Sequence, residues 1–139
     1  VEQLGTVGKA WEIWKSDMDA IFVGSKPGAM SGDGARGVQD TPIIATSAAA
    51  VSSKALAILR KNNTPVAADF LTGIGPALAW WTPEETSQDE LRSSTSKLVT
   101  ELLEETSNHS DGHFMAACYK AEAFIDSWQE QRPFGRPLG

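Results

Sequence analysis

Apolar residues recur at helical spacing through much of this sequence, and nowhere do they alternate with polar residues as in a half-buried strand. The clearest stripe advances in alternating steps of three and four residues: Leu4, Val7, Trp11, Trp14, Met18 and Ile21. Such spacing places apolar side chains along one side of an amphipathic helix. We therefore predict a first helix over about residues 4–22, with its tryptophans in the core.

Further helical segments are predicted over about residues 46–61, 66–81, 84–107 and 113–131. Thr64-Pro65 and Thr82-Pro83 each offer a capping hydroxyl followed by proline, which suits the first position of a helix. Together the five segments cover about 70% of the chain, against the usual third. We therefore expect an all-α fold, a single-domain bundle of about five helices over residues 1–139.

Three interruptions are expected in this bundle. Residues 24–41 are rich in glycine and should form a long flexible loop, and residues 132–139 should form an extended tail. Residues 66–81 are apolar nearly all round, as in a central core helix, but Gly73, Gly75 and Pro76 should kink or break it. Arg60 and Lys61 should lie in the last turn of the 46–61 helix, where positive charge suits the macrodipole, and Asn62-Asn63 should end it.

The glycine-rich loop contains the spacing Gly-x-Gly-x-x-Gly at residues 32–37, which formally matches a dinucleotide fingerprint. That fingerprint binds phosphate only where a strand precedes the glycines and a helix begins directly after them. The segment before these glycines is predicted to be helical, and Asp33 would repel phosphate. A flexible loop is therefore expected here rather than a nucleotide site.

Length, charge and cysteine content exclude several classes of protein. A chain of 139 residues forms one domain, and its single cysteine, Cys118, excludes an internal disulfide and a cysteine-rich zinc site. The net charge of −6 argues against binding duplex nucleic acid, which requires a basic surface. No apolar run is long enough for a membrane span. With no secretory signal in the sequence, a cytoplasmic location is expected.

Negative charge is concentrated in one predicted helix. Between Glu84 and Glu105 there are seven acids and two bases, a net charge of −5. Trp80 and Trp81 directly precede this stretch and point about 100° apart on a helix, so one of them is a candidate for exposure. The alternative is that both rings pack under the glycine-rich loop. Exposed tryptophan is typical of binding hot spots.

The predicted turn between the last two helices contains the most suspect side chains. Glu101, Glu104 and Glu105 lie at the negative end of a helix dipole, where carboxylates are disfavoured. His109, Asp111 and His113 follow directly, and the alternative role of Asp111 is to cap the last helix. Four of these side chains, Glu104, His109, Asp111 and His113, are of the types that bind zinc or another divalent ion.

We therefore expect a non-enzymatic helical protein–protein interaction or assembly module without a cofactor. Its acidic helix would contact a protein with a basic surface, or the chain would associate with itself. The residues expected to make these contacts are Trp80, Trp81, Glu101, Glu104, Phe134 and Leu138. The alternative is a bundle, including an enzyme, that binds a small ligand or a metal at the turn between the last two helices.

Overall fold

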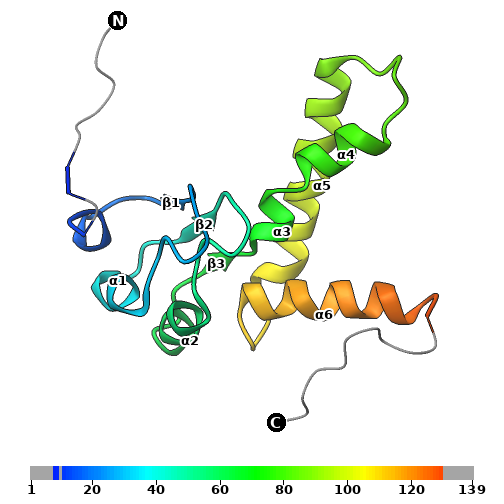
Figure 1. The fold of residues 1–139 in the computed structure, drawn as a ribbon. Helices are drawn as coiled ribbons and strands as arrows, with labels where there is room; N and C mark the ends of the chain where they lie inside the picture. Colours follow the sequence, from blue (N-terminus) through cyan, green and yellow to red (C-terminus); the bar gives the residue numbers. More distant parts are fainter. Residues whose placement is uncertain (1–7, 10, 130–139) are drawn as a thin grey trace, which may run out of the picture.

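The computed structural model describes residues 8, 9 and 11–129. Its first half is a β-α-β-α-β unit, seen on the left of Figure 1. The elements are β1 (Ile21–Val23), α1 (Gly32–Gly37), β2 (Ile43–Ala45), α2 (Ser53–Lys61) and β3 (Val66–Ala67). The strands form a parallel sheet in the order β1-β2-β3.

The second half consists of helices: α3 (Asp69–Thr72), α4 (Gly75–Trp81), α5 (Gln88–Ser107) and α6 (His113–Asp126). Helices α4 and α5 lie side by side and project away from the sheet, whereas α6 runs back across the end of α5 (Figure 1). The described residues thus form a mixed α/β structure, and the expected all-α bundle is wrong.

The main core lies between the sheet and helices α1 and α2, which pack against each other on one face. Alternate strand residues enter this core, namely Ile21 and Val23 from β1 and Ile43 from β2. The side chain between the first two, Phe22, lies on the other face of β1 and is 67% exposed. Parallel sheets are usually covered on both faces, so the open side of β1 is an exception.

The first predicted helix, over residues 4–22, is not formed in the part of that segment that the structure describes. Residues 13–15 form one 3₁₀ turn, η1 (Ile13–Lys15), and residues 21–23 are β1. Trp11 and Met18 are exposed, and only Trp14 of the three packs against the core. The helical spacing of these residues was therefore coincidental, and its first members, Leu4 and Val7, lie outside the described residues.

The glycine-rich segment 24–41 is also not the expected loop. It contains α1, and Met30, Ala35 and Val38 are buried in the core. The glycines permit close packing: a Cβ on Gly34 would lie 3.0 Å from Trp14 Nε1, and one on Gly32 would lie 2.8 Å from the side chain of Lys54. The Gly-x-Gly-x-x-Gly spacing therefore forms a short, tightly packed helix.

The helices begin and end only partly where expected. Residues 66–81 are not one core helix but comprise β3, α3 and α4. The predicted break is present, because α3 ends at Thr72 with Gly73 as its C-cap and α4 begins at Gly75. The longest helix begins at Gln88 with a capping box of Ser87 and Glu90, four residues later than predicted. Helix α2 is capped by Ser52.

Candidate functional site

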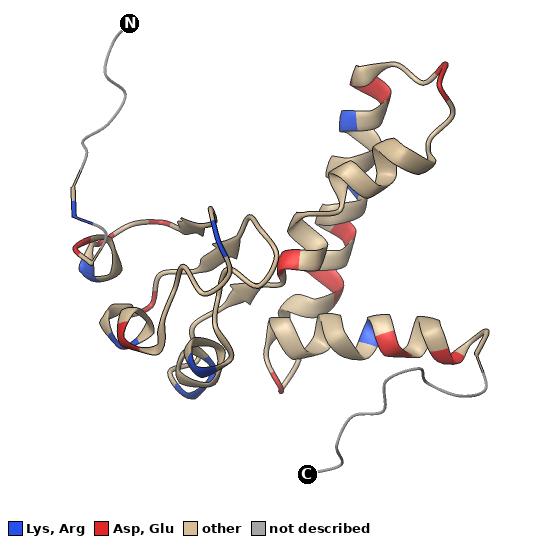
Figure 2. Cartoon of the chain, in the orientation of Figure 1, with Lys and Arg blue, Asp and Glu red and all other residues tan. Residues whose placement is uncertain are grey.

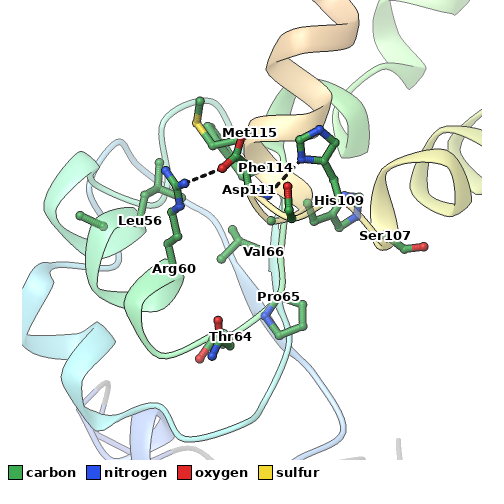
Figure 3. A pocket seen from close by; sticks show the side chains of 15 residues that line it. Leu56, Arg60, Thr64, Pro65, Val66, Ser107, His109, Asp111, Phe114 and Met115 are labelled. Atoms are coloured by element: carbon green, nitrogen blue, oxygen red, sulfur yellow. Dashed lines mark hydrogen bonds and ion pairs between the residues drawn. The ribbon is translucent and has the colours of Figure 1, made fainter. Parts of the chain in front are cut away.

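A cavity of about 440 Å³ lies between α2, the start of β3 and the turn joining α5 to α6 (Figure 3). Its apolar lining includes Leu56, Val66, Phe114 and Met115. The polar lining includes Arg60, Asn63, Ser107, His109, Asp111 and His113. The structure thus brings three of the suspected residues, His109, Asp111 and His113, to the wall of one cavity, which is of the size that holds a small ligand.

Arg60 and Asp111 connect the two sides of this cavity. Arg60 Nη2 of α2 donates to Asp111 Oδ1 over 2.9 Å, and Tyr119 Oη donates to Asp111 Oδ2 over 3.1 Å. Asp111 is therefore not the cap of the last helix. The N-cap of α6 is Gly112, whose φ of +80° suits glycine, and no side chain caps this helix.

His109 lies in the turn with a defined hydrogen-bond pattern. The backbone N–H of Asp111 donates to His109 Nδ1 over 3.0 Å, and the imidazole lies 5.5 Å from the Tyr119 ring, between centroids. Because Nδ1 is an acceptor, a neutral His109 has its proton on Nε2. The ring therefore offers one N–H group to a ligand.

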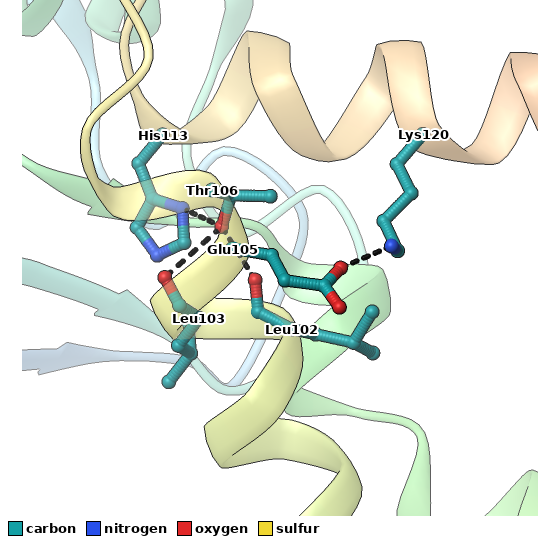
Figure 4. Close-up of polar contacts among 6 residues, drawn as sticks. All are labelled: Leu102, Leu103, Glu105, Thr106, His113 and Lys120. Carbon is teal, nitrogen blue, oxygen red and sulfur yellow. Dashed lines mark hydrogen bonds and ion pairs between the residues drawn. The ribbon is translucent and has the colours of Figure 1, made fainter.

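His113 is held by the last turn of α5 (Figure 4). Thr106 Oγ1 donates its one proton to Leu102 O over 2.7 Å and therefore accepts from His113 Nδ1, 2.6 Å away. Burial lowers the pKa of His113 below its ordinary value of 6.5, and a backbone hydrogen bond offsets this only in part. His113 is thus neutral at pH 7, with an unprotonated Nε2.

The four suspected metal ligands do not form a metal centre. Among residues 8, 9 and 11–129, no three side chains of His, Cys, Asp or Glu come together in a way that could hold a metal ion. Glu104 is exposed on α5 and does not line the cavity, and Asp111 is engaged by Arg60 and Tyr119.

The second candidate surface is at the far end of α4. Trp80 and Trp81 are 85% and 80% exposed, so both rings face solvent, although only one was a candidate for exposure. Glu101 and Glu104 lie on the exposed side of α5, and Glu101 Oε1 is 3.9 Å from Lys97 Nζ. Phe134 and Leu138, the other two expected contact residues, lie outside the described residues.

Two features of these surfaces were missed from the sequence. Arg60 was assigned to the end of its own helix, and its partner Asp111 is 51 residues away. Phe124 of α6 and Trp128, just after this helix, are both exposed and form an edge-to-face pair with centroids 6.4 Å apart. Helical periodicity does not reveal either feature, because both depend on how α6 is placed.

Comparisons place no further constraint on these two surfaces. In the part of the chain that the structure describes, no helix has the length and apolar character needed to cross a bilayer. Comparison with protein families, with curated proteins and with solved structures finds no match to this chain.

Proposed function

We propose that this chain is a protein–protein interaction module whose helical projection docks on a partner with a basic surface. We call residues 75–105, which comprise α4, its link to α5 and most of α5, the acidic arm. The observation that carries the proposal is the high exposure of two adjacent tryptophans, Trp80 and Trp81, on this arm. Tryptophan contributes large binding energies when a partner covers it.

The acidic arm lacks a core of its own. No residue of α4 is buried, and in α5 the one buried residue is Thr106, which lies beyond the arm. Apolar side chains along α5, such as Leu91, Leu98 and Val99, are only half-buried. A helix pair of this kind is stabilised by few internal contacts, and a partner that covers it would bury the remaining apolar surface.

The charge distribution indicates the chemistry of the partner. Figure 2 shows acids dispersed over the helical half, whereas most of the bases lie in the half that contains the sheet, including those of α1 and α2. The described residues from 68 onward contain eleven acids and three bases, and those before 68 contain five acids and seven bases. An acidic surface attracts a basic one over a Debye length of about 8 Å at physiological salt.

A basic amphipathic peptide of lysine and leucine tests this proposal. We expect it to bind the purified chain, to quench tryptophan fluorescence and to bind more weakly as salt rises. The double variant Trp80→Ser, Trp81→Ser should reduce the affinity at least about tenfold, because hot-spot truncations cost about 2 kcal/mol or more. Trp11→Ser, at another exposed tryptophan, is the matched control and should bind as the wild type does.

Sedimentation velocity of the wild type and the same variants tests whether the partner is a second copy of this chain. An oligomer that dissociates when Trp80 and Trp81 are replaced would make the partner a second copy, with the α1–α2 layer as its basic surface. The proposal is wrong if the peptide binds the double variant as tightly as the wild type, or if the wild type binds no basic peptide and sediments as a monomer at all concentrations.

A further inference from the structure

The cavity between α2 and the α5–α6 turn is lined by both apolar side chains and hydrogen-bond donors. Leu56 on α2, Val66 at the start of β3 and Phe114 on α6 provide apolar surface, and Met115 extends it. Arg60 and His109 provide hydrogen-bond donors from opposite sides, as Figure 3 shows. Such a lining suits a molecule with an apolar body and one polar end.

Arg60 is the one Lys or Arg among the residues that line this cavity. A guanidinium carries five N–H donors in a planar fork, and the hydrogen bond to Asp111 uses one of them. The side chains of Arg60 and Asp111 are 57% and 38% exposed, so their ion pair lies near solvent and contributes little to stability. Arg60 is thus able to bind a second carboxylate without unfolding the site.

The neighbouring groups favour negative charge at the same end of the cavity. A neutral His109 has an Nε2–H donor, because its Nδ1 accepts from the backbone. The first turn of α6 contains no acid, and His113, Phe114 and Met115 in that turn all line the cavity. Asp111 is the one lining acid, and its two oxygens already accept from Arg60 and Tyr119.

We propose that this cavity binds a small monocarboxylate with an apolar body, such as an arylalkanoate. The carboxylate is held by the free edge of the Arg60 guanidinium, and the apolar body packs against Leu56, Val66 and Phe114. A carboxylate matches the planar fork of one arginine. A phosphate monoester has a charge of about −1.5 to −2 near neutral pH, for which one already paired cation is insufficient.

Titrations followed by amide chemical shifts in ¹⁵N–¹H NMR spectra test the ligand class. The probes are phenylacetate, its neutral amide phenylacetamide, acetate and inorganic phosphate. We expect phenylacetate to bind and to shift amides of residues 107–115 and of α2 near Arg60. The amide, acetate and phosphate should each bind at least about tenfold more weakly, because each lacks either the charge, the apolar body or the match to one arginine.

Three variants locate the binding. Arg60→Gln should remove the preference for phenylacetate over phenylacetamide, whereas Arg92→Gln, at an exposed arginine of α5, should leave it unchanged. Asp111→Asn should increase the affinity for phenylacetate, because it removes the competing carboxylate. Ala57→Trp, at an exposed position of the lining, should fill the cavity and abolish binding of both aromatic probes.

Several outcomes would overturn the proposal. It is wrong if none of the probes binds at millimolar concentration, or if phenylacetamide or phosphate binds as well as phenylacetate. It is equally wrong if the shifted amides lie outside the cavity, or if Arg60→Gln and Arg92→Gln give the same affinities. Because Trp80 and Trp81 do not line the cavity, each of these outcomes leaves the acidic arm untested and unaffected.

Discussion

Thr106 Oγ1 and His113 Nδ1 lie 2.6 Å apart, and their hydrogen bond joins the last turn of α5 to the first turn of α6. Thr106 is only 2% exposed and also donates to Leu102 O. Its one proton is therefore used, and the imidazole has its proton on Nδ1, directed at this hydroxyl. This bond sets the geometry of the turn that carries His109 and Asp111.

Stability should depend on pH through His113. Since burial lowers the pKa of His113 in the folded chain, the unfolded chain binds this proton more tightly than the folded chain does. The contribution of His113 is thus complete above pH 6.5 and is lost as the pH falls from there toward the lowered pKa. Urea unfolding of the wild type and His113→Gln at pH 7.5 and pH 5 measures this.

The wild type should lose more stability than His113→Gln between these two pH values, and His109→Gln should behave as the wild type. A difference between wild type and His113→Gln that does not change with pH would contradict the expected burial of the imidazole.

Thr106→Val should destabilise the chain by about 1–3 kcal/mol, because it leaves the half-buried Nδ1–H of His113 without its acceptor. Thr100→Val is the matched control, since Thr100 is an exposed threonine of the same helix. Chemical denaturation gives both free energies of unfolding. Equal effects of the two substitutions would show that the Thr106–His113 hydrogen bond contributes nothing measurable.

Gly34→Ala should destabilise the chain by about 1–3 kcal/mol and change the fluorescence of Trp14, because the added methyl group would lie 3.0 Å from its indole nitrogen. Gly75→Ala is the control. Its methyl group would meet Thr95 at 3.8 Å, an ordinary contact, and should leave stability unchanged or slightly higher. If thermal melts and emission spectra are the same for Gly34→Ala and the wild type, α1 and Trp14 are not packed as described.

The double variant Glu101→Gln, Glu104→Gln should retain the fold and be slightly more stable, because it removes negative charge from the C-terminal part of α5. Binding of a basic partner should weaken and become less sensitive to salt. Asp89→Asn, in the first turn of the same helix, should instead lower stability. Binding unchanged by the double variant at low salt would exclude these two carboxylates from the contact.

Sequence patterns predict the helical half much better than the sheet. The end of α5, the start of α6 and the break at Gly73 follow from helix-terminating residues and could be located. The strands contain two or three residues each, too few to show a period, and their hydrogen-bond partners are distant in sequence. A local pattern contains no information on such pairing.

Three of the residues that line the cavity were singled out from the sequence, although the cavity itself was not predicted. His109, Asp111 and His113 could be placed together from the sequence, because residues so close along the chain lie in one turn. Arg60 was explained by the dipole of its own helix, and only the tertiary fold brings it to Asp111. The exposure of Phe22 and Trp128 likewise depends on which faces remain uncovered, and a single sequence does not specify this.

The parallel sheet has a consequence for how the chain folds. Ile21 pairs with Ile43, and Ile43 pairs with Val66, so each pairing closes a loop of more than twenty residues. Closing such loops costs entropy before any contact compensates for it, and parallel pairing is therefore slow. Helices α5 and α6 are joined by a short turn and meet through nearby residues. We expect α5 and α6 to pack against each other before the sheet forms, and pairing of the strands in the β-α-β-α-β unit to set the overall folding rate.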